Sequence, residues 1–579
     1  MPPGARRHRT SRTSRTSRTS RMSCPVNRTS VPAPGRTEAR ISRTGHPHPP
    51  ITTAVRRKSM SRAAGPRGRM PSVNHLLYGL AANPALPSEL VDRLIAVADA
   101  DVDHGLAGRA DLSRAQAATL AARDEGNGVL LAYEGRLTAA DVDPTAQPLA
   151  ALALLDEGAG APEWARLLAV DPDVEHREKL AACPGLPPDV VETLAADSDV
   201  RVVVELALWA APDVAARLAG HPHAEVRRAV AANEATPPDV LAALVSGEGL
   251  PPARRCLVCD REEPPFTHSA DCPRPDCDLR PGASCDGSHE STAHDTLWAA
   301  LDNPATPAQA VAGFADHPST ALRWALAARP GLPPEAYARL AADPTPGARA
   351  DLAENPAIDD TLIRALADDT SPDVRRGLAH NPRVPLDVLT HVAATTRIGS
   401  TLLPRIASAT AAEAEELARS PHAVVRMLLA QRRDLPAEIR DALADDPDAK
   451  VAKSVAPHPG LSEARLRAMA DRHGVQVTAG VAANPDATPA LLEHLSRHRP
   501  PARKAFRAIA RHRHATGAAL LACLADERAK PFAAGHPALP PEVITDLLTD
   551  PHAQVAEAAA ANPSLPRAVM EKLTRELLP

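Results

Sequence analysis

Five of the eight cysteines in the 579-residue chain lie close together, between positions 256 and 285. They form a Cys-x2-Cys pair, a second pair spaced by five residues, and a single cysteine that opens the pentapeptide Cys-Asp-Gly-Ser-His. A close pair of thiolates chelates one metal ion, and two such pairs complete the tetrahedral site of structural zinc. Four thiolates also hold iron–sulfur clusters, in some proteins with histidine replacing cysteine. The candidate metal ligands are Cys256, Cys259, Cys272, Cys277, Cys285 and His289.

The segment around these cysteines, residues 250–294, is rich in Pro, Asp and Gly and poor in apolar side chains. It has no core of its own, so a metal or disulfides must hold it together. Disulfides need an oxidising compartment, and an odd set of five cysteines leaves one thiol over. Because the chain shows no apolar signal-peptide core, we expect a metal-binding insertion in a cytoplasmic protein. Cys183 and Cys523 are expected to be packing residues.

A basic stretch between positions 497 and 513 is the second group of residues suited to chemistry. Arg503, Arg507 and Arg511 are spaced by four, so on a helix they share a face and could hold an anion or an acidic partner. Phe506 is the one aromatic residue in this stretch, which does not favour stacking of single-stranded nucleic acid. The chain contains no P-loop, dinucleotide-binding glycine pattern, Gly-x-Ser-x-Gly elbow or His-Glu-x-x-His motif, so we expect no enzyme.

Charge divides the chain into two unequal parts. Residues 1–69 hold 17 Lys+Arg and one acid, Glu38, whereas residues 70–579 hold 49 Lys+Arg and 70 Asp+Glu, a formal charge of −21. The leader has too few apolar residues for a core and is predicted to be disordered, with Met60 or Met70 as alternative starts. The acidic remainder repels phosphate backbones, which argues against nucleic-acid binding over the whole surface. Apolar stretches are also far shorter than the roughly 18 residues of a transmembrane helix.

An internal repeat must position these residues. Asn-Pro-x-x-Pro blocks and their variants recur along the chain, and those at 303, 329, 355 and 381 are spaced by 26 residues. An apolar pair spaced by four precedes each block and indicates one face of a short helix. The prolines then break that helix, and a Pro-acid step such as Pro334-Glu335 suits the first turn of a second helix. The pairs are Leu322/Leu326, Ala348/Leu352, Val374/Leu378, Val200/Val204 and Val226/Val230.

Two helices in 26 residues are too short to stand alone, so the repeats must bury their apolar faces against one another. The prediction is an all-α solenoid, an elongated superhelical stack, with repeat blocks at 70–249 and 295–579 on either side of the insertion. Residues 100–165 look helical but do not fall on the 26-residue register. An arginine that recurs near the start of the first helix favours a structural ladder between repeats over a ligand-binding stripe. Its copies are Arg201, Arg227, Arg323, Arg349, Arg375 and Arg426.

The repeat pattern resembles the leucine-rich repeat variant family, with residues 223–244 and 372–392 closest to its signature. The resemblance covers most of residues 165–579. It implies a superhelix of alternating α and 3₁₀ helices, together with a small cysteine-rich module that binds a 4Fe-4S cluster. The pentapeptide from Cys285 to His289 is also similar to the core of CDGSH proteins, which bind 2Fe-2S through three cysteines and one histidine.

These patterns predict a protein-interaction scaffold of helical repeats that carries a cysteine-ligated iron–sulfur or zinc site. The resemblance favours 4Fe-4S over 2Fe-2S. Two other functions stay open at this point. In one, the cluster is a redox sensor that switches partner binding. In the other, the protein associates with DNA through the basic stretch at 497–513. A protein partner on the solenoid surface is expected, without membrane insertion or a small-molecule substrate.

Overall fold

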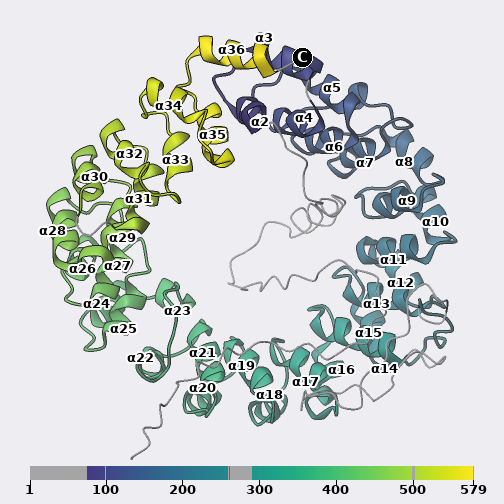
Figure 1. Ribbon diagram of the computed structural model, residues 1–579. Coiled ribbons are helices and arrows are strands. Elements are labelled where there is room, and N and C mark those ends of the chain that lie inside the picture. Colours follow the sequence, from purple (N-terminus) through teal and green to yellow (C-terminus); the bar gives the residue numbers. More distant parts are fainter. Residues whose placement is uncertain (1–74, 98, 258–259, 261–289, 499–501, 578–579) are drawn as a thin grey trace, which may run out of the picture.

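The computed structural model describes residues 75–97, 99–257, 260, 290–498 and 502–577. These residues form a stack of helical hairpins in which each repeat contributes one helix to an inner layer and one to an outer layer (Figure 1). The all-α repeat architecture predicted from the periodicity is confirmed. No helix among the described residues is long and apolar enough to cross a membrane.

The inner helices begin each repeat. They are α2 (His75–Ala82), α4 (Ala100–Ala107), α6 (Glu125–Tyr133), α7 (Pro148–Asp156), α9 (Val174–Ala181), α11 (Val200–Trp209), α13 (Ala224–Ala232), α15 (Glu290–Asp302), α17 (Thr320–Ala327), α19 (Pro346–Glu354), α21 (Pro372–His380), α23 (Pro404–Ala407), α25 (Ala423–Leu429), α27 (Ala449–Val455), α29 (Thr478–Ala482), α31 (Arg503–Ala510), α33 (Lys530–Ala534) and α35 (Ala553–Ala560).

The outer helices follow the turn of each repeat. They are α3 (Ser88–Val97), α5 (Arg114–Arg123), α8 (Pro162–Leu168), α10 (Pro188–Ala195), α12 (Pro212–Leu218), α14 (Pro238–Ser246), α16 (Ala308–Val311), α18 (Pro334–Ala341), α20 (Asp360–Ala367), α22 (Leu386–Thr395), α24 (Ala411–Ala418), α26 (Ala437–Ala444), α28 (Glu463–His473), α30 (Pro489–Ser496), α32 (Gly517–Cys523), α34 (Pro541–Leu547) and α36 (Arg567–Leu577). In the described residues, 3₁₀ helix is confined to η2 (Ala139–Asp141), η3 (Ala312–Asp316) and η4 (Gly474–Gln476).

Local sequence explains where the helices begin. Pro334 is the first residue of α18 and an acid follows it, as the Pro-acid step predicts, because proline needs no N–H partner there and a carboxylate favours the helix N-terminus. The predicted apolar pairs Leu322/Leu326, Ala348/Leu352, Val374/Leu378 and Val226/Val230 are buried. The prediction that Val200 and Val204 form the buried face of their helix is wrong. Val203 and Ala207 take these core positions in α11, and Val200 and Val204 are half-buried.

A ladder of buried polar side chains joins successive repeats. The Asn381 amide, fully buried, donates to the carbonyls of Ala353 (2.9 Å) and Asn355 (2.8 Å) in the preceding repeat, and its oxygen accepts from the N–H of Arg383 (2.8 Å). The side chain at this position hydrogen-bonds backbone groups at the ends of stacked helices, which would otherwise be buried without a partner. Other ladder residues are Asn233, Asn303, Arg329, Asn355, His458, Asn484, His512, His536 and Asn562.

The ladder also assigns the register that sequence could not. Arg109 occupies the ladder position after α4 and donates to the carbonyls of Ala81 (2.8 Å) and Asn83 (2.7 Å). Arg136 then donates to the carbonyl of Arg109 (3.0 Å). Residues 100–165 therefore continue the same stack, with arginine in place of asparagine. Across the insertion, Asn303 donates to Ala231 and Asn233, so α15 stacks directly on α13.

The stack closes on itself, which differs from the predicted elongated superhelix. Asn83 donates to the carbonyls of Ala560 (2.8 Å) and Asn562 (2.8 Å), partners that lie more than 470 residues away in sequence. Helix α2 packs against α35, and α3 packs against α36, so the first repeat takes its place beyond the last (Figure 1). The protein is a closed ring.

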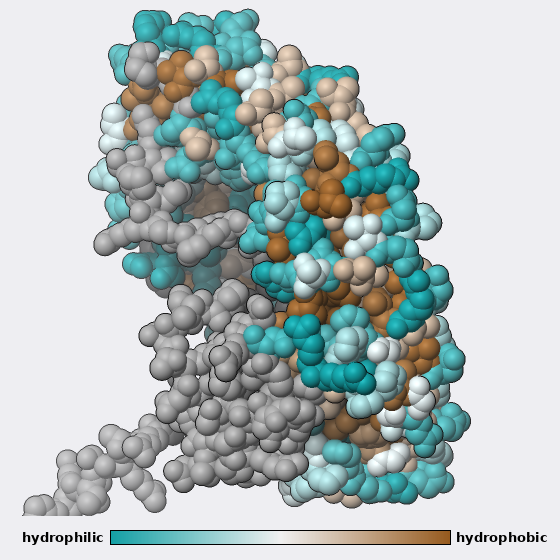
Figure 2. All heavy atoms as spheres, turned by 90° about the vertical axis from the view of Figure 1, so that its right-hand side faces the viewer, coloured by the Kyte–Doolittle hydropathy of each residue, from teal (hydrophilic) through white to brown (hydrophobic). Residues whose placement is uncertain are grey.

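Hydrophilic residues cover much of the outer side of the ring, with apolar residues visible between them (Figure 2). The core lies between the two layers and consists of small and medium side chains, mainly Ala, Leu and Val. It forms two clusters, a large one that includes both ends of the described chain and a smaller one from α11 to α15. Such side chains allow the short helices to approach closely. The inner helices turn the face opposite this core towards the inside of the ring.

Candidate functional site

Most of the recurring arginines tie one repeat to the next. Arg349 donates to both carboxylate oxygens of Asp369 (2.8 and 3.0 Å) and to the carbonyl of Asp343 (2.6 Å), and these hydrogen bonds lower the pKa of the Asp369 carboxyl. Arg323 and Arg426 pair in the same way with Asp343 and Asp446 (2.6 Å each). The structural ladder predicted for these arginines is therefore seen directly. It leaves these guanidinium groups engaged within the ring.

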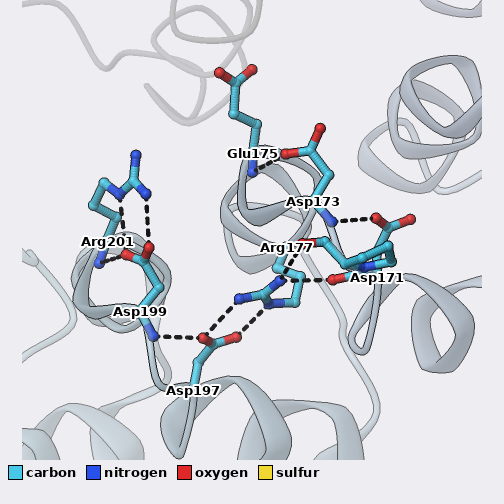
Figure 3. A network of polar contacts seen from close by, with 8 residues as sticks. Asp171, Asp173, Glu175, Arg177, Asp197, Asp199 and Arg201 are labelled. Carbon is cyan, nitrogen blue, oxygen red and sulfur yellow. Dashed lines mark hydrogen bonds and ion pairs between the residues drawn. The ribbon is translucent and has the colours of Figure 1, made fainter.

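The arginine ladder varies at three places. Arg375 donates to the hydroxyl of Thr396 (2.7 Å) instead of an acid. Arg201 pairs with its neighbour Asp199 (2.7 Å), while Arg177, one repeat earlier, binds Asp197 (2.7 Å) in the next turn (Figure 3). Arg227 donates to the carbonyl of His221 (2.7 Å), and burial lowers its pKa.

The described part of the cysteine-rich insertion lies at its base, against α13. Of the six predicted metal ligands, Cys256 is described and is fully buried. Cys259, Cys272, Cys277, Cys285 and His289 lie outside the described residues. Among the residues that the structure describes, no group of three or more His, Cys, Asp or Glu side chains is arranged to hold a metal ion.

Two carboxylates and a histidine fix the chain on both sides of Cys256. His223 is buried, with Nδ1 2.7 Å from a Glu225 oxygen and Nε2 3.1 Å from an Asp260 oxygen. The Leu257 N–H donates to Glu225 (3.1 Å), and the N–H of Ala224 donates to the carbonyl of Arg255 (3.0 Å). Burial raises the pKa of Glu225, but the hydrogen bonds from His223 and Leu257 outweigh it and leave that pKa lowered. The entry of the insertion is thus anchored to the inner layer.

Sequence analysis missed this anchor. His223 precedes α13 and Glu225 is in its first turn, where they read as ordinary turn and first-turn residues. One residue in the sequence could have indicated the anchor. Asp260 directly follows the Cys-x2-Cys pair, and a carboxylate in a segment without a core needs a polar partner.

The basic stretch forms one exposed face of α31, as its spacing predicts. Arg503, Arg507 and Arg511 are exposed, and Lys504 joins them. The opposite face, with Ala505 and Ile509, is buried in the core. In the part of the chain that the structure describes, none of these four cations has a carboxylate partner within an ion-pair distance. Because α31 packs against α32 on its outer side, this exposed face is turned towards the inside of the ring.

The exposed face of α31 offers no open aromatic ring for stacking among the described residues. Phe506 is buried in the core and offers no face for stacking. The guanidinium of Arg511 instead lies over the ring of Phe532 in the next repeat, 3.8 Å from its centroid. The arginine covers one aromatic face in a cation–π contact.

Cys183 and Cys523 are packing residues, as predicted. Cys183 takes the place of a ladder asparagine, 3.8 Å from the carbonyl of Leu152. Cys523 is fully buried, and burial raises the pKa of its thiol to about 12. A thiol with so high a pKa is not a nucleophile near neutral pH.

Comparisons with known proteins add little to this geometry. No protein-family model matches the sequence, and no curated protein matches it. One matching solved structure is the crystal structure of an engineered protein, at 15% sequence identity, covering 84% of this chain and 98% of that chain with a TM-score of 0.15. At that TM-score the likeness carries no argument about fold or function.

Proposed function

We propose that this ring of helical repeats is a protein-interaction scaffold that binds a partner protein along its inner side. The support is that the inner helices bury one face in the core between the layers and present the other around the closed ring. Solenoids present extended surfaces of this kind, built from one side chain set per repeat. Most of the recurring arginines, and the ladder asparagines, are engaged between repeats, so partner recognition falls to the exposed positions.

The binding test is selection of peptides from a random displayed library on the full-length protein. Hydrogen exchange of the complexes then maps the bound site. We expect enriched peptides to protect inner helices. Protection confined to outer helices, or no enriched peptide after selection, contradicts the scaffold.

The proposal includes a cysteine-ligated metal site in residues 250–294, an iron–sulfur cluster with zinc as the alternative. Its support is the burial of Cys256 within a base fixed by His223, Glu225 and Asp260. These residues would orient the first thiolate, and the metal would supply the crosslink that the segment cannot obtain from a core. The resemblance to leucine-rich repeat variant proteins is part of the same proposal and favours 4Fe-4S.

Metal, sulfide and visible absorption are to be measured on anaerobically purified protein. About four iron with sulfide and a broad band near roughly 400 nm support the cluster, whereas one zinc in a colourless protein supports a structural clip. Cys256→Ser should lower the metal content, and Cys523→Ser, at a buried cysteine in a repeat, should not. A wild-type protein without metal contradicts this part of the proposal.

A further inference from the structure

One arc of the inner layer is basic throughout. Within the described residues, the inner helices α25, α27, α29, α31 and α33 contain no Asp or Glu. Two of their cations are used between repeats, Arg426 with Asp446 and Lys530 with Asp550. The others are exposed, and together with Arg528, which lies before α33 beside the exposed Glu527, they are called the basic arc. It consists of Lys450, Lys453, Arg503, Lys504, Arg507, Arg511 and Arg528.

The basic arc is a local exception in an acidic molecule. Residues 70–579 carry a formal charge of −21. Several other inner helices carry acids beside their bases, as with Glu175 and Glu178 on α9 or Asp351 and Glu354 on α19. Like charges on neighbouring helices repel one another when no acid intervenes. Among the described residues, the members of the arc have no carboxylate within ion-pair distance, so their charge is open to an anionic partner.

The side chains of the arc point away from the core. In α27, Val451, Ala452 and Val455 are buried, while Lys450 and Lys453 lie on the opposite side. Between α27 and α31, helix α29 offers only small side chains at the equivalent place, so a bound chain can lie close to the wall there. The cations of α27 and α31 thus lie on either side of a surface of small side chains on α29.

The dimensions suit an extended peptide. Neighbouring packed helices lie about 8–10 Å apart, so the span from α27 to α33 is about 30 Å. An extended chain advances about 3.3 Å per residue, which corresponds to about nine or ten residues. Three residues of such a chain cover the step from one inner helix to the next.

We propose that the basic arc docks an extended acidic peptide segment of a partner protein. This inference rests on the proposed scaffold and names the partner chemistry and the place. Single-stranded nucleic acid is the less suitable occupant, because its bases need free aromatic faces. Phe506 is buried and Arg511 covers Phe532. The phosphate backbone of a nucleic acid that continued beyond the arc would also meet the acidic part of the ring. A peptide can carry acidic residues opposite the arc and neutral residues elsewhere.

The test uses the full chain and a fluorescein-labelled decapeptide with glutamate at every third position and glycine or serine between. Binding is followed by fluorescence anisotropy at low and moderate salt. We expect affinity that falls as salt rises, because the contacts are exposed charge pairs. Lys504→Glu/Arg507→Glu should weaken binding at least tenfold. The matched control Arg93→Glu/Arg575→Glu reverses two exposed cations on α3 and α36 and should change affinity less than twofold.

Melting curves check that each variant folds, and Lys504→Gln/Arg507→Gln replaces the reversal if the latter does not. A ten-nucleotide oligo-dT is the competing probe. Tighter binding of oligo-dT than of the peptide, with the same loss in the double reversal, overturns the proposal in favour of nucleic acid. Peptide binding that ignores the double reversal, or no binding, also overturns it. In both cases peptides selected on other inner helices would leave the scaffold standing.

Discussion

At the scale of single residues, the ladder position decides how repeats adhere. A leucine in place of Asn381 would leave the carbonyls of Ala353 and Asn355 and the N–H of Arg383 without their partner. Since buried unsatisfied groups cost about 1–3 kcal/mol each, Asn381→Leu should lower the free energy of unfolding by about 3 kcal/mol or more. Urea denaturation followed by circular dichroism measures it.

Histidine supplies the matched control, because the chain already uses it at this position. Asn381→His keeps one donor and one acceptor, in the arrangement that His512 and His536 show. It should recover a substantial part of the loss seen with leucine. Equal destabilisation by the two substitutions would show that side-chain volume, and not hydrogen bonding, governs the position.

The ladder histidines make stability dependent on pH. His458 is fully buried and donates from Nε2 to the carbonyl of Ala430 (2.9 Å); burial lowers its pKa to about 4. Burial also lowers the pKa values of His512 and His536. Each stays neutral in the ring but takes up a proton near pH 6.5 when unfolded. Their contribution is therefore complete above about pH 6.5 and falls at lower pH, and that of His458 is lost as pH falls towards 4.

Substituting asparagine at these positions should remove this dependence. Between pH 7 and pH 4, His458 alone accounts for a loss of about 3 kcal/mol, the free energy that separates a pKa of about 6.5 from one of about 4. His458→Asn should flatten the unfolding free energy in that window, as measured by urea titrations at several pH values. His552→Asn, at an exposed histidine, is the control. An unchanged slope in His458→Asn would contradict the assignment.

Residue types in the repeat were predictable, but their partners were not. The recurring arginine indicated a ladder because a charged residue at a constant position needs a constant partner. The ladder residue was seen only as a helix-breaking Asn-Pro, since Asn, Arg and His share no obvious class until their hydrogen bonds are known. The anchor at His223 likewise depends on contacts over 37 residues to Asp260, which no local pattern encodes.

At the scale of elements, the contact between α2 and α35 holds the ring shut. Gly79 on α2 lies so close to α35 that a Cβ there would collide with the carbonyl of Glu557 and stand 2.8 Å from the Cβ of Ala560. Gly79→Ala should therefore weaken this contact by about 1–3 kcal/mol. We expect faster hydrogen exchange in α2, α35 and α36, with the other repeats unchanged. Gly313→Ala, where a Cβ meets nothing within 4 Å, is the control.

If Gly79→Ala loosens every helix to the same extent, the contact between α2 and α35 does not open independently of the other repeats. Gly377→Ala is a second comparison, at a junction inside the stack. Gly377 has the equivalent position on α21, where a Cβ would collide with the carbonyl of Ala350 inside the stack. Its substitution should loosen α19 and α21 and leave α2 and α35 protected.

Helix existence and order followed well from sequence, and their limits had physical causes. The Pro-acid steps placed the starts of α10, α14, α18 and α34, because proline is tolerated only in a first turn. Helices α4 to α8 had no register from sequence because Arg109 and Arg136 lack the following proline that marks the block elsewhere, as Pro330 does after Arg329. The ladder position accepts either asparagine or arginine as hydrogen-bond donor, so the repeats keep their spacing although the residue at this position differs.

At the scale of the whole molecule, ring closure replaces end caps. An open solenoid needs terminal repeats with a polar outer face. Here Leu77 of α2 and Met570 of α36 are both buried, at 6% and 2% exposure. Sequence could not reveal this, because curvature accumulates from a small tilt at every junction and carries no residue signature. The joint between the ends uses the same hydrogen bonds as any other junction.

A circular permutant tests this equivalence. Joining the end of α36 to the start of α2 with a glycine–serine linker, and opening the chain between Gly399 and Ser400, moves the ends to an exposed loop between α22 and α23. We expect the permutant to keep the helicity and radius of gyration of residues 75–577, with an unfolding free energy within about 1 kcal/mol, since exposed loops tolerate new ends. Expansion in small-angle scattering would show that the two ends do not meet in solution.

Closure also bears on how such a chain can diverge over generations. In an open stack, recombination can duplicate or delete a unit, because a free end simply moves. In this ring, loss of one 26-residue unit such as 329–354 would leave a gap one helix wide between α2 and α35. A change of tilt at every junction would have to close that gap, or the ring would stay open. Substitution of Asn by Arg, His or Cys is tolerated at the ladder, as the chain itself shows. The number of units is the feature that this architecture holds constant.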